Sequence, residues 1–303
     1  MIEENMMKET PMNNQTSRTQ YVDVEGGRIA YEVVGHGPLV VLSPGMADTR
    51  SAYRFLAPLI ANAGYRVASV DLRAHGDSST GWTSYTHTDT AHDLIEVIQH
   101  LGGPAVLVGQ SFSGGAATLA AVTNPDLIRA IVYIAPFTRP PHYSLAAMLT
   151  NPHNYRRGAL LLAQFALAGS VKAWLKYLNV AYPSRKPADW DTYLAALGAN
   201  LREPGRMKAA QTMVSSQATL KEAAKQLANV RCPALVVMGR NDSDFPDPEA
   251  EAAAIVGLLP TGLGRYEMIE DAGHYPHAQY PQQVADATPS CRSSPSTAMT
   301  RGA

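Results

Sequence analysis

The sequence has few cysteines, no long uninterrupted apolar run and almost no net charge. Its two cysteines, Cys232 and Cys291, lie far apart and provide neither a disulfide framework nor the spacing of a metal site. The most apolar window, 158–175, is interrupted by polar side chains and is too short to span a membrane. The formal net charge of −1 gives a nucleic-acid partner no overall electrostatic attraction.

The beginning of the chain also lacks a targeting signal, and the chain as a whole lacks internal repeats. Residues 1–20 are polar and contain no apolar core of a secretory signal, so we expect a cytoplasmic protein. A content of 46% hydrophobic and 17% charged residues is typical of an ordinary globular chain with an ample core. We expect two disordered ends, 1–19 and 288–303, the second of which is rich in Ser, Thr and Pro.

Short β-prone segments alternate with helix-prone segments along most of the chain. The expected strands are 21–25, 28–34, 39–42, 67–70, 105–108, 130–134, 234–238 and 265–269. The expected helices of this part are 50–63, 88–100, 115–122, 248–258 and 281–287. Gly26-Gly27 indicates a hairpin between the first two strands. This alternation predicts an α/β fold with a mostly parallel sheet covered by helices on both faces.

The alternation is interrupted once, by residues 138–229, where strand signals vanish and the pattern is helical. We therefore expect a core in two parts, 20–137 and 230–287, with a helical insertion between them. The excess of Lys and Arg in this insertion is interpreted as a solvated face. Its aromatic side chains form either the insertion's own core or the roof of a large apolar pocket. They are Tyr143, Tyr155, Trp174, Tyr177, Tyr182, Trp190 and Tyr193.

The most informative stretch is 105–115, Ala-Val-Leu-Val-Gly-Gln-Ser-Phe-Ser-Gly-Gly. A buried strand that turns into a helix within a few residues places its turning residue, here Ser111, in a strained conformation. Small residues are needed two positions to either side so that the backbones can pass. Gly109 and Ser113 meet this requirement, although Ser113 departs from the glycine of the strict pattern. The stretch predicts a nucleophile elbow, with the Ser111 hydroxyl presented above the sheet beside a helix N-terminus.

Other chemistry-bearing segments also follow expected strands. Residues 43–46 and 71–78 follow the strands at 39–42 and 67–70, and Asp242 and His274 follow the last two strands. Ligands of such sheets bind beyond the carboxyl ends of the strands. We therefore expect these segments to meet Ser111 at one edge of the sheet.

Together these segments resemble the α/β-hydrolase superfamily over residues 21–287. The resemblance rests on the elbow, on Ser-Pro-Gly-Met at 43–46, on Asp-Leu-Arg-Ala-His-Gly-Asp-Ser at 71–78, on Gly-Arg-Asn-Asp at 239–242 and on Ala-Gly-His at 272–274, in this order. It implies that the insertion 138–229 is the cap domain. It further implies that Ser111 attacks, that His274 transfers the proton and that Asp242 orients the imidazole. The implied oxyanion donors are the backbone N–H groups of Met46 and Phe112.

Several alternatives for these roles stay open. His277 is the rival of His274, and Asp244 and Asp247 compete with Asp242 for the role of the acid. Residues 135–139, after the sixth expected strand, contain no carboxylate, which excludes an acid there. The other histidines considered, His75, His87, His92 and His100, are interpreted as loop or helix-surface residues, and His75 and Asp77 as structural.

The expected function is that of a serine hydrolase that cleaves a small-molecule carboxylic ester or lactone through an acyl-enzyme, without a metal, cofactor, nucleic acid or membrane. A serine at position 111 argues against the dehalogenases and epoxide hydrolases of this fold, which use an aspartate. General carboxylesterases, perhydrolases and carbon–carbon bond hydrolases share the triad and remain alternatives, as does a non-enzymatic receptor. The runs 238–252 and 273–277 resemble a bacterial esterase group that includes enzymes opening the lactone of macrolide antibiotics.

Overall fold

The computed structural model describes residues 18–140 and 153–288. The predicted disorder of both ends therefore falls almost entirely outside the described residues, as do Cys291 and Tyr143. At the margins, the Thr19 hydroxyl accepts a hydrogen bond from Arg50, and the Thr288 hydroxyl donates one to the Val284 carbonyl. Both margins are thus attached to the folded core.

The centre of the fold is an eight-stranded sheet in the order β1-β2-β4-β3-β5-β6-β7-β8. Strands β1 and β2 form the expected antiparallel hairpin, β2 also runs antiparallel to β4, and every later pair is parallel. The predicted fold class is confirmed. The strands are β1 (Gln20–Val24), β2 (Gly27–Val34), β3 (Leu39–Ser43), β4 (Arg66–Val70), β5 (Ala105–Gln110), β6 (Ile128–Ile134), β7 (Ala234–Gly239) and β8 (Gly264–Ile269).

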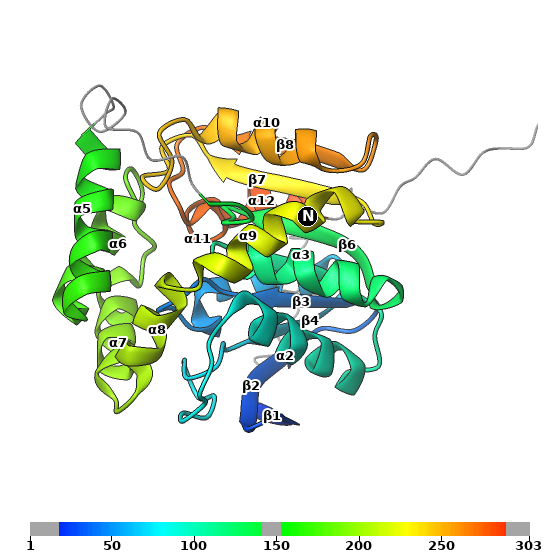
Figure 1. Cartoon of the computed structure of the whole chain (residues 1–303), viewed down its shortest axis with the longest axis horizontal. Coiled ribbons are helices and arrows are strands. Elements are labelled where there is room, and N and C mark those ends of the chain that lie inside the picture. Colours follow the sequence, from blue (N-terminus) through cyan, green and yellow to red (C-terminus); the bar gives the residue numbers. More distant parts are fainter. Residues whose placement is uncertain (1–17, 141–152, 289–303) are drawn as a thin grey trace, which may run out of the picture.

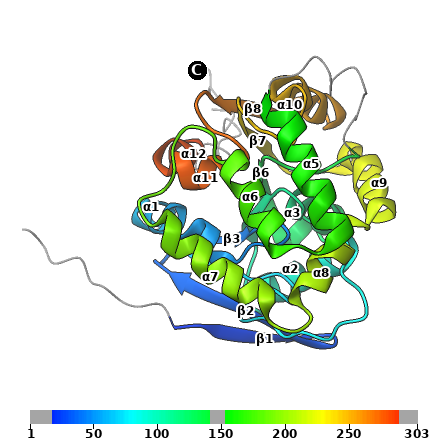
Figure 2. The same ribbon diagram turned by 90° about the vertical axis from the view of Figure 1, so that its left-hand side faces the viewer.

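Helices cover both faces of the sheet, as Figure 2 shows. One face carries α1 (Leu56–Asn62) and α12 (Pro281–Ala287), and the other carries α2 (His87–His100), α3 (Ser113–Thr123) and α10 (Pro248–Leu258). Successive side chains of a strand point to opposite faces. In β5, accordingly, Ala105 and Leu107 join the apolar cluster under α2 and α3, whereas Val106 and Val108 join the cluster under α1 and α12. A short 3-10 helix, η2 (Pro125–Leu127), leads into β6.

The single helix predicted at 50–63 is wrong, because two helices occupy this segment. A 3-10 helix, η1 (Arg50–Tyr53), precedes α1, and its turns are closed by bonds from Ala52 N–H to Thr49 and from Arg54 N–H to Ser51. The Arg50 backbone N–H donates to Asp71, and its guanidinium binds Glu32 and Asp77. The break before α1 follows from Pro58, the third residue of that helix, which has no N–H to bond the Arg54 carbonyl and is tolerated only in a first turn.

Four helices of the insertion stand over the carboxyl ends of the strands, at the left of the sheet in Figure 1. They are α5 (His153–Ala168), α6 (Val171–Ala181), α7 (Trp190–Arg202) and α8 (Arg206–Val214). The next helix, α9 (Gln217–Gln226), returns along α3, and its Ala223 belongs to the core cluster under α2 and α3, as does Leu227 of η3 (Leu227–Asn229). The limits of the cap, 138–229, stay a prediction. Among the described helices, none is both long and apolar enough to cross a membrane.

Candidate active site

Ser111 follows the end of β5 directly and has a φ of 51°, in the left-handed region that residues with a side chain rarely adopt. Neighbouring backbone holds it there, since its N–H donates to the Ile134 carbonyl at 3.0 Å and its carbonyl accepts from Phe137 at 2.9 Å. A Cβ at Gly109 would lie 2.5 Å from the Ser113 carbonyl oxygen, so the turn requires glycine there. The strained elbow expected from the sequence is therefore present, and strain held by its surroundings is common at functional sites.

Ser113 does more than leave room for the turn. Its hydroxyl donates to the Pro44 carbonyl at 2.5 Å and lies 2.8 Å from the Ser43 hydroxyl, which is left to act as the donor of that pair. On the same side, a Cβ at Gly45 would lie 3.0 Å from the Ser111 Cβ. Ser113, at the position where the strict elbow pattern has glycine, thus connects the turn 43–46 to the elbow by hydrogen bonds.

Two backbone donors are left free beside Ser111. Within the described part of the chain, neither the Met46 N–H nor the Phe112 N–H makes a hydrogen bond, and both residues line the same cavity as Ser111. The next N–H along, that of Ala47, donates to His75 Nε2 at 2.9 Å. The expected pair of oxyanion donors is therefore sterically and chemically available at this place.

His75 lies in the loop after β4, as expected, and its side chain is buried there. Its Nε2 accepts from Ala47, which leaves the proton on Nδ1, and Nδ1 donates to the Arg73 carbonyl at 2.7 Å. Burial lowers the pKa of His75 to about 4, so the ring is neutral at neutral pH. His75 therefore has a structural role, because it connects the turn after β4 with the turn after β3.

His274 and Asp242 form a buried hydrogen-bonded pair after β8 and β7. His274 Nδ1 lies 2.9 Å from one Asp242 carboxylate oxygen and 3.1 Å from the other. The His274 backbone is held from both sides, since its N–H donates to Ala181 at the end of α6 and its carbonyl accepts from the Gln110 side chain. The bond to Gln110 connects the His274 turn with the elbow, although the structure shows no hydrogen bond between the Ser111 hydroxyl and His274.

Asp244 occupies the other side of the imidazole, where its carboxylate lies 3.5 Å from His274 Nε2. The Tyr177 hydroxyl of α6 lies 2.8 Å from both Asp244 oxygens. Burial raises the pKa of Asp244 to about 6. For His274, burial alone lowers the pKa, but the carboxylates of Asp242 and Asp244 raise it to about 9. The contact with Tyr177 has no signal in the sequence, since 67 positions separate the two residues.

The rival candidates are placed elsewhere. The His277 ring packs against Tyr53 at a centroid distance of 4.8 Å, and neither of its nitrogens has a hydrogen-bond partner in the structure as described. The Asp247 carboxylate accepts from the Ala250 N–H and so caps α10. Neither residue contacts His274 or Asp242 by a described hydrogen bond. The geometry therefore brings together Asp242 and His274, with Asp244 as an additional neighbour.

The other histidines divide into two groups. His92 and His100 are exposed on α2, as expected, but the prediction of His87 as a loop or helix-surface residue is wrong, because it is a buried residue of α2. His87 is buried, stacks on Phe112 at a centroid distance of 4.1 Å and hydrogen-bonds Thr219 through Nδ1. Helix α9 packs against α2 and covers His87, and the sequence pattern of α2 alone does not show this contact. His87 consequently lines the cavity above Ser111.

This cavity has a volume of about 520 Å³ and lies between the elbow and helices α5, α8 and α9. Most of its lining is apolar, including Phe112, Phe137, Leu162, Met213 and Leu220. Of the predicted roof aromatics, Tyr155 lines it, whereas Trp174, Tyr177, Tyr182 and Tyr193 are buried in the apolar cluster of the insertion and Trp190 packs against that cluster. Both expected roles of these aromatics are therefore found.

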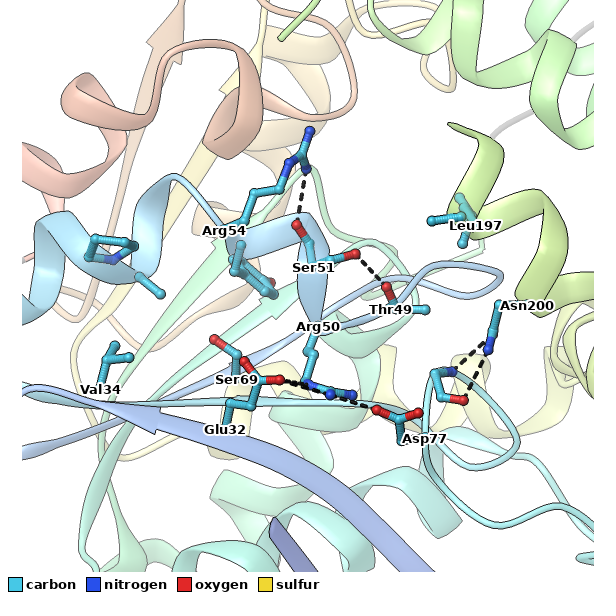
Figure 3. Close-up of a pocket in the computed structure, with 15 residues that line it drawn as sticks. Glu32, Val34, Thr49, Arg50, Ser51, Arg54, Ser69, Asp77, Leu197 and Asn200 are labelled. Atoms are coloured by element: carbon cyan, nitrogen blue, oxygen red, sulfur yellow. Dashed lines mark hydrogen bonds and ion pairs between the residues drawn. The ribbon is translucent and has the colours of Figure 1, made fainter. Parts of the chain in front are cut away.

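A second cavity, of about 460 Å³, shares none of these lining residues and is shown in Figure 3. It lies between η1, α7 and the turn after β4. Arg50 lies there between Glu32 and Asp77, and Asn200 bonds the backbone of Gly76. Its charges are thus already paired, and it contains none of the candidate catalytic residues.

Among the described residues, one group has donors spaced for a metal ion: Asp242, Asp244 and His274 each offer a ligand atom within 4.8 Å of the others. In the structure, His274 Nδ1 is hydrogen-bonded to Asp242, and Asp244 lies 3.5 Å from Nε2. The donor set is therefore accounted for by a carboxylate–imidazole pair with a second carboxylate beside it.

Residues 40–287 match the alpha/beta hydrolase family, and the chain belongs to this family. Over 132 residues it is 28% identical to bifunctional epoxide hydrolase 2 of Rattus norvegicus, and this match covers 42% of this chain and 24% of that protein. Over 169 residues it is 31% identical to the 2-(acetamidomethylene)succinate hydrolase of Mesorhizobium japonicum, which covers 55% of this chain and 57% of that protein. The chain thus spans between a quarter and somewhat over half of the length of these relatives.

The fold is also that of solved hydrolase structures. A serine hydrolase involved in carbazole degradation superposes with a TM-score of 0.70 at 19% identity, over 91% of this chain and 98% of the other. At this level of identity the likeness concerns the fold, and function has to be argued from the site itself.

Proposed function

We propose that the chain is a serine hydrolase that cleaves a carboxylic ester or lactone through an acyl-enzyme on Ser111. The observation that carries this proposal is the strained Ser111, at the tip of β5, in one cavity with two free backbone N–H groups, while Gln110 of the elbow bonds the buried His274–Asp242 pair. A serine hydroxyl becomes a nucleophile when an oriented base takes its proton. These are the parts that this chemistry requires.

In the proposed reaction the Ser111 oxygen attacks the ester carbonyl while His274 Nε2 takes the hydroxyl proton. The Asp242 carboxylate holds the Nδ1 proton and stabilises the imidazolium, and the N–H groups of Met46 and Phe112 bind the oxyanion. His274 returns its proton to the leaving alcohol. A water molecule, deprotonated by His274, then attacks the acyl group and releases the acid, which restores Ser111. Catalytic hydrogen bonds often tighten only when substrate binds, as the bond from Ser111 to His274 must do here.

The alternatives differ in how well the site supports them. Epoxide hydrolases of this fold use an aspartate where this chain has Ser111, so the relatives of that name do not favour epoxide opening here. Perhydrolases, carbon–carbon bond hydrolases and general carboxylesterases can use the same triad, and a receptor would need none of it. Turnover of a short-chain chromogenic ester by the purified protein separates the enzymes from the receptor.

For the substrate we propose a macrolide lactone. The cavity of about 520 Å³ is of the size that small-molecule sites have, and its apolar lining suits a bulky ring with few fixed polar contacts. The resemblance of 238–252 and 273–277 to the macrolide esterase group supports the same choice. We expect the purified protein to add the mass of one water to a macrolide, measured by mass spectrometry over a panel of ring sizes. Intact macrolides alongside fast cleavage of aryl esters would reduce the proposal to a general carboxylesterase.

The oxyanion turn offers a further prediction, Gly45→Ala. A Cβ at position 45 would clash with the Gln110 side-chain oxygen and lie 3.0 Å from the Ser111 Cβ, so the Gln110 side chain that bonds the His274 carbonyl, or the turn itself, must shift. Because a displacement of about 1 Å can cost about 100-fold in rate, we expect kcat/KM for an aryl ester to fall by about that factor. The measurement is steady-state kinetics on the purified variant.

The control is Gly257→Ala in α10, where an added Cβ meets nothing within 4 Å. Alanine in place of an exposed helical glycine stabilises by about 0.5–1 kcal/mol, so this variant should unfold at slightly higher temperature with unchanged kcat/KM. If Gly45→Ala kept full activity, the close approach of the turn 43–46 to Gln110 and Ser111 would not matter for catalysis.

A further inference from the structure

We infer that Asp244 makes this site selective for esters that carry a positively charged ammonium group, because its carboxylate is buried in the wall of the apolar cavity next to the reacting atoms. The inference rests on the proposed function, and it deepens it by naming the class of substrate.

Asp244 is the one carboxylate among the described residues that line the cavity, and no Lys or Arg is among them. Its side chain is 3% exposed, and most of the other residues that line the cavity are apolar, among them Phe112, Phe137, Leu162 and Met213. The nearest cation to this buried carboxylate is the protonated His274 imidazole, 3.5 Å away, which is shared with Asp242. A buried carboxylate that lost this partner would be costly, because the surroundings replace little of its hydration. An ammonium group that enters the cavity can pair with Asp244 in place of His274.

The hydrogen bonds of Asp244 leave acceptor capacity unused. Tyr177 approaches both carboxylate oxygens, but one hydroxyl has a single proton and satisfies one of them at a time. The Ser243 hydroxyl adds a longer bond of 3.3 Å, and the Asp244 backbone N–H is bound to Asp242 at 2.9 Å. The carboxylate is thus held in place from its own loop and from α6, with lone pairs left for a further donor.

An ammonium group bound to Asp244 also changes the protonation of His274. With Asp244 3.5 Å from Nε2, the free enzyme has a carboxylate on each side of the imidazole, and both favour the protonated ring. A protonated His274 cannot accept the Ser111 proton. An ammonium group paired with Asp244 removes one of the two attractions and returns the ring toward its neutral, basic form. Cationic esters therefore gain in binding and in the availability of the base.

The remaining titratable groups around the pair do not replace this effect. The phenols of Tyr155, Tyr177 and Tyr275 have raised pKa values because they are buried, and all three stay neutral. Burial lowers the pKa of His277 to about 3, so its ring is uncharged beside His274. Asp242 stays bonded to Nδ1 in either state. Asp244 is consequently the group through which a charged ligand changes the pKa of His274.

The test is a matched pair of esters, choline butyrate and 3,3-dimethylbutyl butyrate, in which carbon replaces the charged nitrogen. We expect kcat/KM at pH 7 to be at least about tenfold higher for the choline ester, since about 1.4 kcal/mol of pairing corresponds to tenfold. Asp244→Asn should abolish this preference. Asp247→Asn is the control, because Asp247 caps α10 outside the cavity and asparagine caps as well as aspartate.

A second readout is the pH profile of kcat/KM for the neutral ester. In the wild-type protein, activity should rise with pH up to the raised pKa of His274, because the base is the neutral ring. Without the Asp244 charge that pKa is lower, so the profile of Asp244→Asn should shift toward lower pH. A role of Asp244 in folding alone would leave the profile in place. Tyr177→Phe, which keeps the carboxylate, should retain the preference for the choline ester.

Equal kcat/KM for the two esters, or a preference that survives in Asp244→Asn, would overturn the inference while leaving the serine hydrolase proposal intact. Binding of phenyltrimethylammonium, measured by calorimetry, tests the cation site separately from ester hydrolysis. We expect it to bind the wild-type protein and Ser111→Ala equally, and to bind Asp244→Asn at least about tenfold more weakly. Binding of this kind without hydrolysis of either ester, of an aryl ester or of a macrolide would overturn the proposed function and support the cation site.

Discussion

Ser111→Ala is expected to lower kcat for ester hydrolysis by about 10³- to 10⁶-fold, the range found when the nucleophile of a serine triad is removed. Without the hydroxyl no acyl-enzyme forms, and the remaining rate comes from binding and from the oxyanion donors. Stability should change by less than about 1 kcal/mol, because the substitution leaves the backbone bonds of Ser111 to Ile134 and Phe137 in place. Steady-state kinetics and thermal unfolding of the same preparation measure both quantities.

Ser51→Ala is a suitable control, since Ser51 is exposed on η1 and lies outside the cavity of Ser111. Its activity should equal that of the wild-type protein. A phosphonate that reacts with activated serines should label the wild-type protein at Ser111 and leave Ser111→Ala unlabelled. Wild-type turnover by Ser111→Ala, or a label on another serine, would show that the nucleophile is a different residue.

Asp242→Asn is expected to reduce kcat by about 10⁴-fold, as the loss of the orienting carboxylate does in other triads. The amide no longer stabilises an imidazolium, and its N–H₂ group favours the tautomer that carries the His274 proton on Nε2, where the base must be free. The Oδ1 of asparagine can still accept the Asp244 backbone N–H, so the loop should keep its fold. The measurement is kcat for a neutral aryl ester, together with the circular dichroism of the variant.

Asp244→Asn provides the comparison on the same loop. For a neutral ester we expect a much smaller loss than in Asp242→Asn, because Asp244 lies beside Nε2 and makes no bond to Nδ1. If the ranking were reversed, Asp244 would be the orienting acid and the assignment of Asp242 would be wrong.

Local sequence rules were sufficient for the elements and the turns. All eight strands were predicted within two or so residues at each end, because buried parallel strands are short β-prone runs bounded by glycine and polar residues. The elbow was predictable because small residues at 109 and 113 allow a strained Ser111 between strand and helix. The helix predicted at 50–63 failed because Pro58 has no backbone N–H to bond the Arg54 carbonyl, so α1 begins only at Leu56 and keeps Pro58 in its first turn.

The sequence by itself therefore determined the sheet, the order of the chemistry-bearing turns and the edge at which they gather, since strand direction carries each turn to the same side. The tertiary structure decided which side chains meet there. The burial of His75 and His87, the bonds of Ser113 to the turn 43–46, and the placement of Asp244 between His274 and Tyr177 all join segments far apart in the chain. Such contacts depend on how helices α6 and α9 pack over the sheet, and periodicity along one segment contains no information about its distant neighbours.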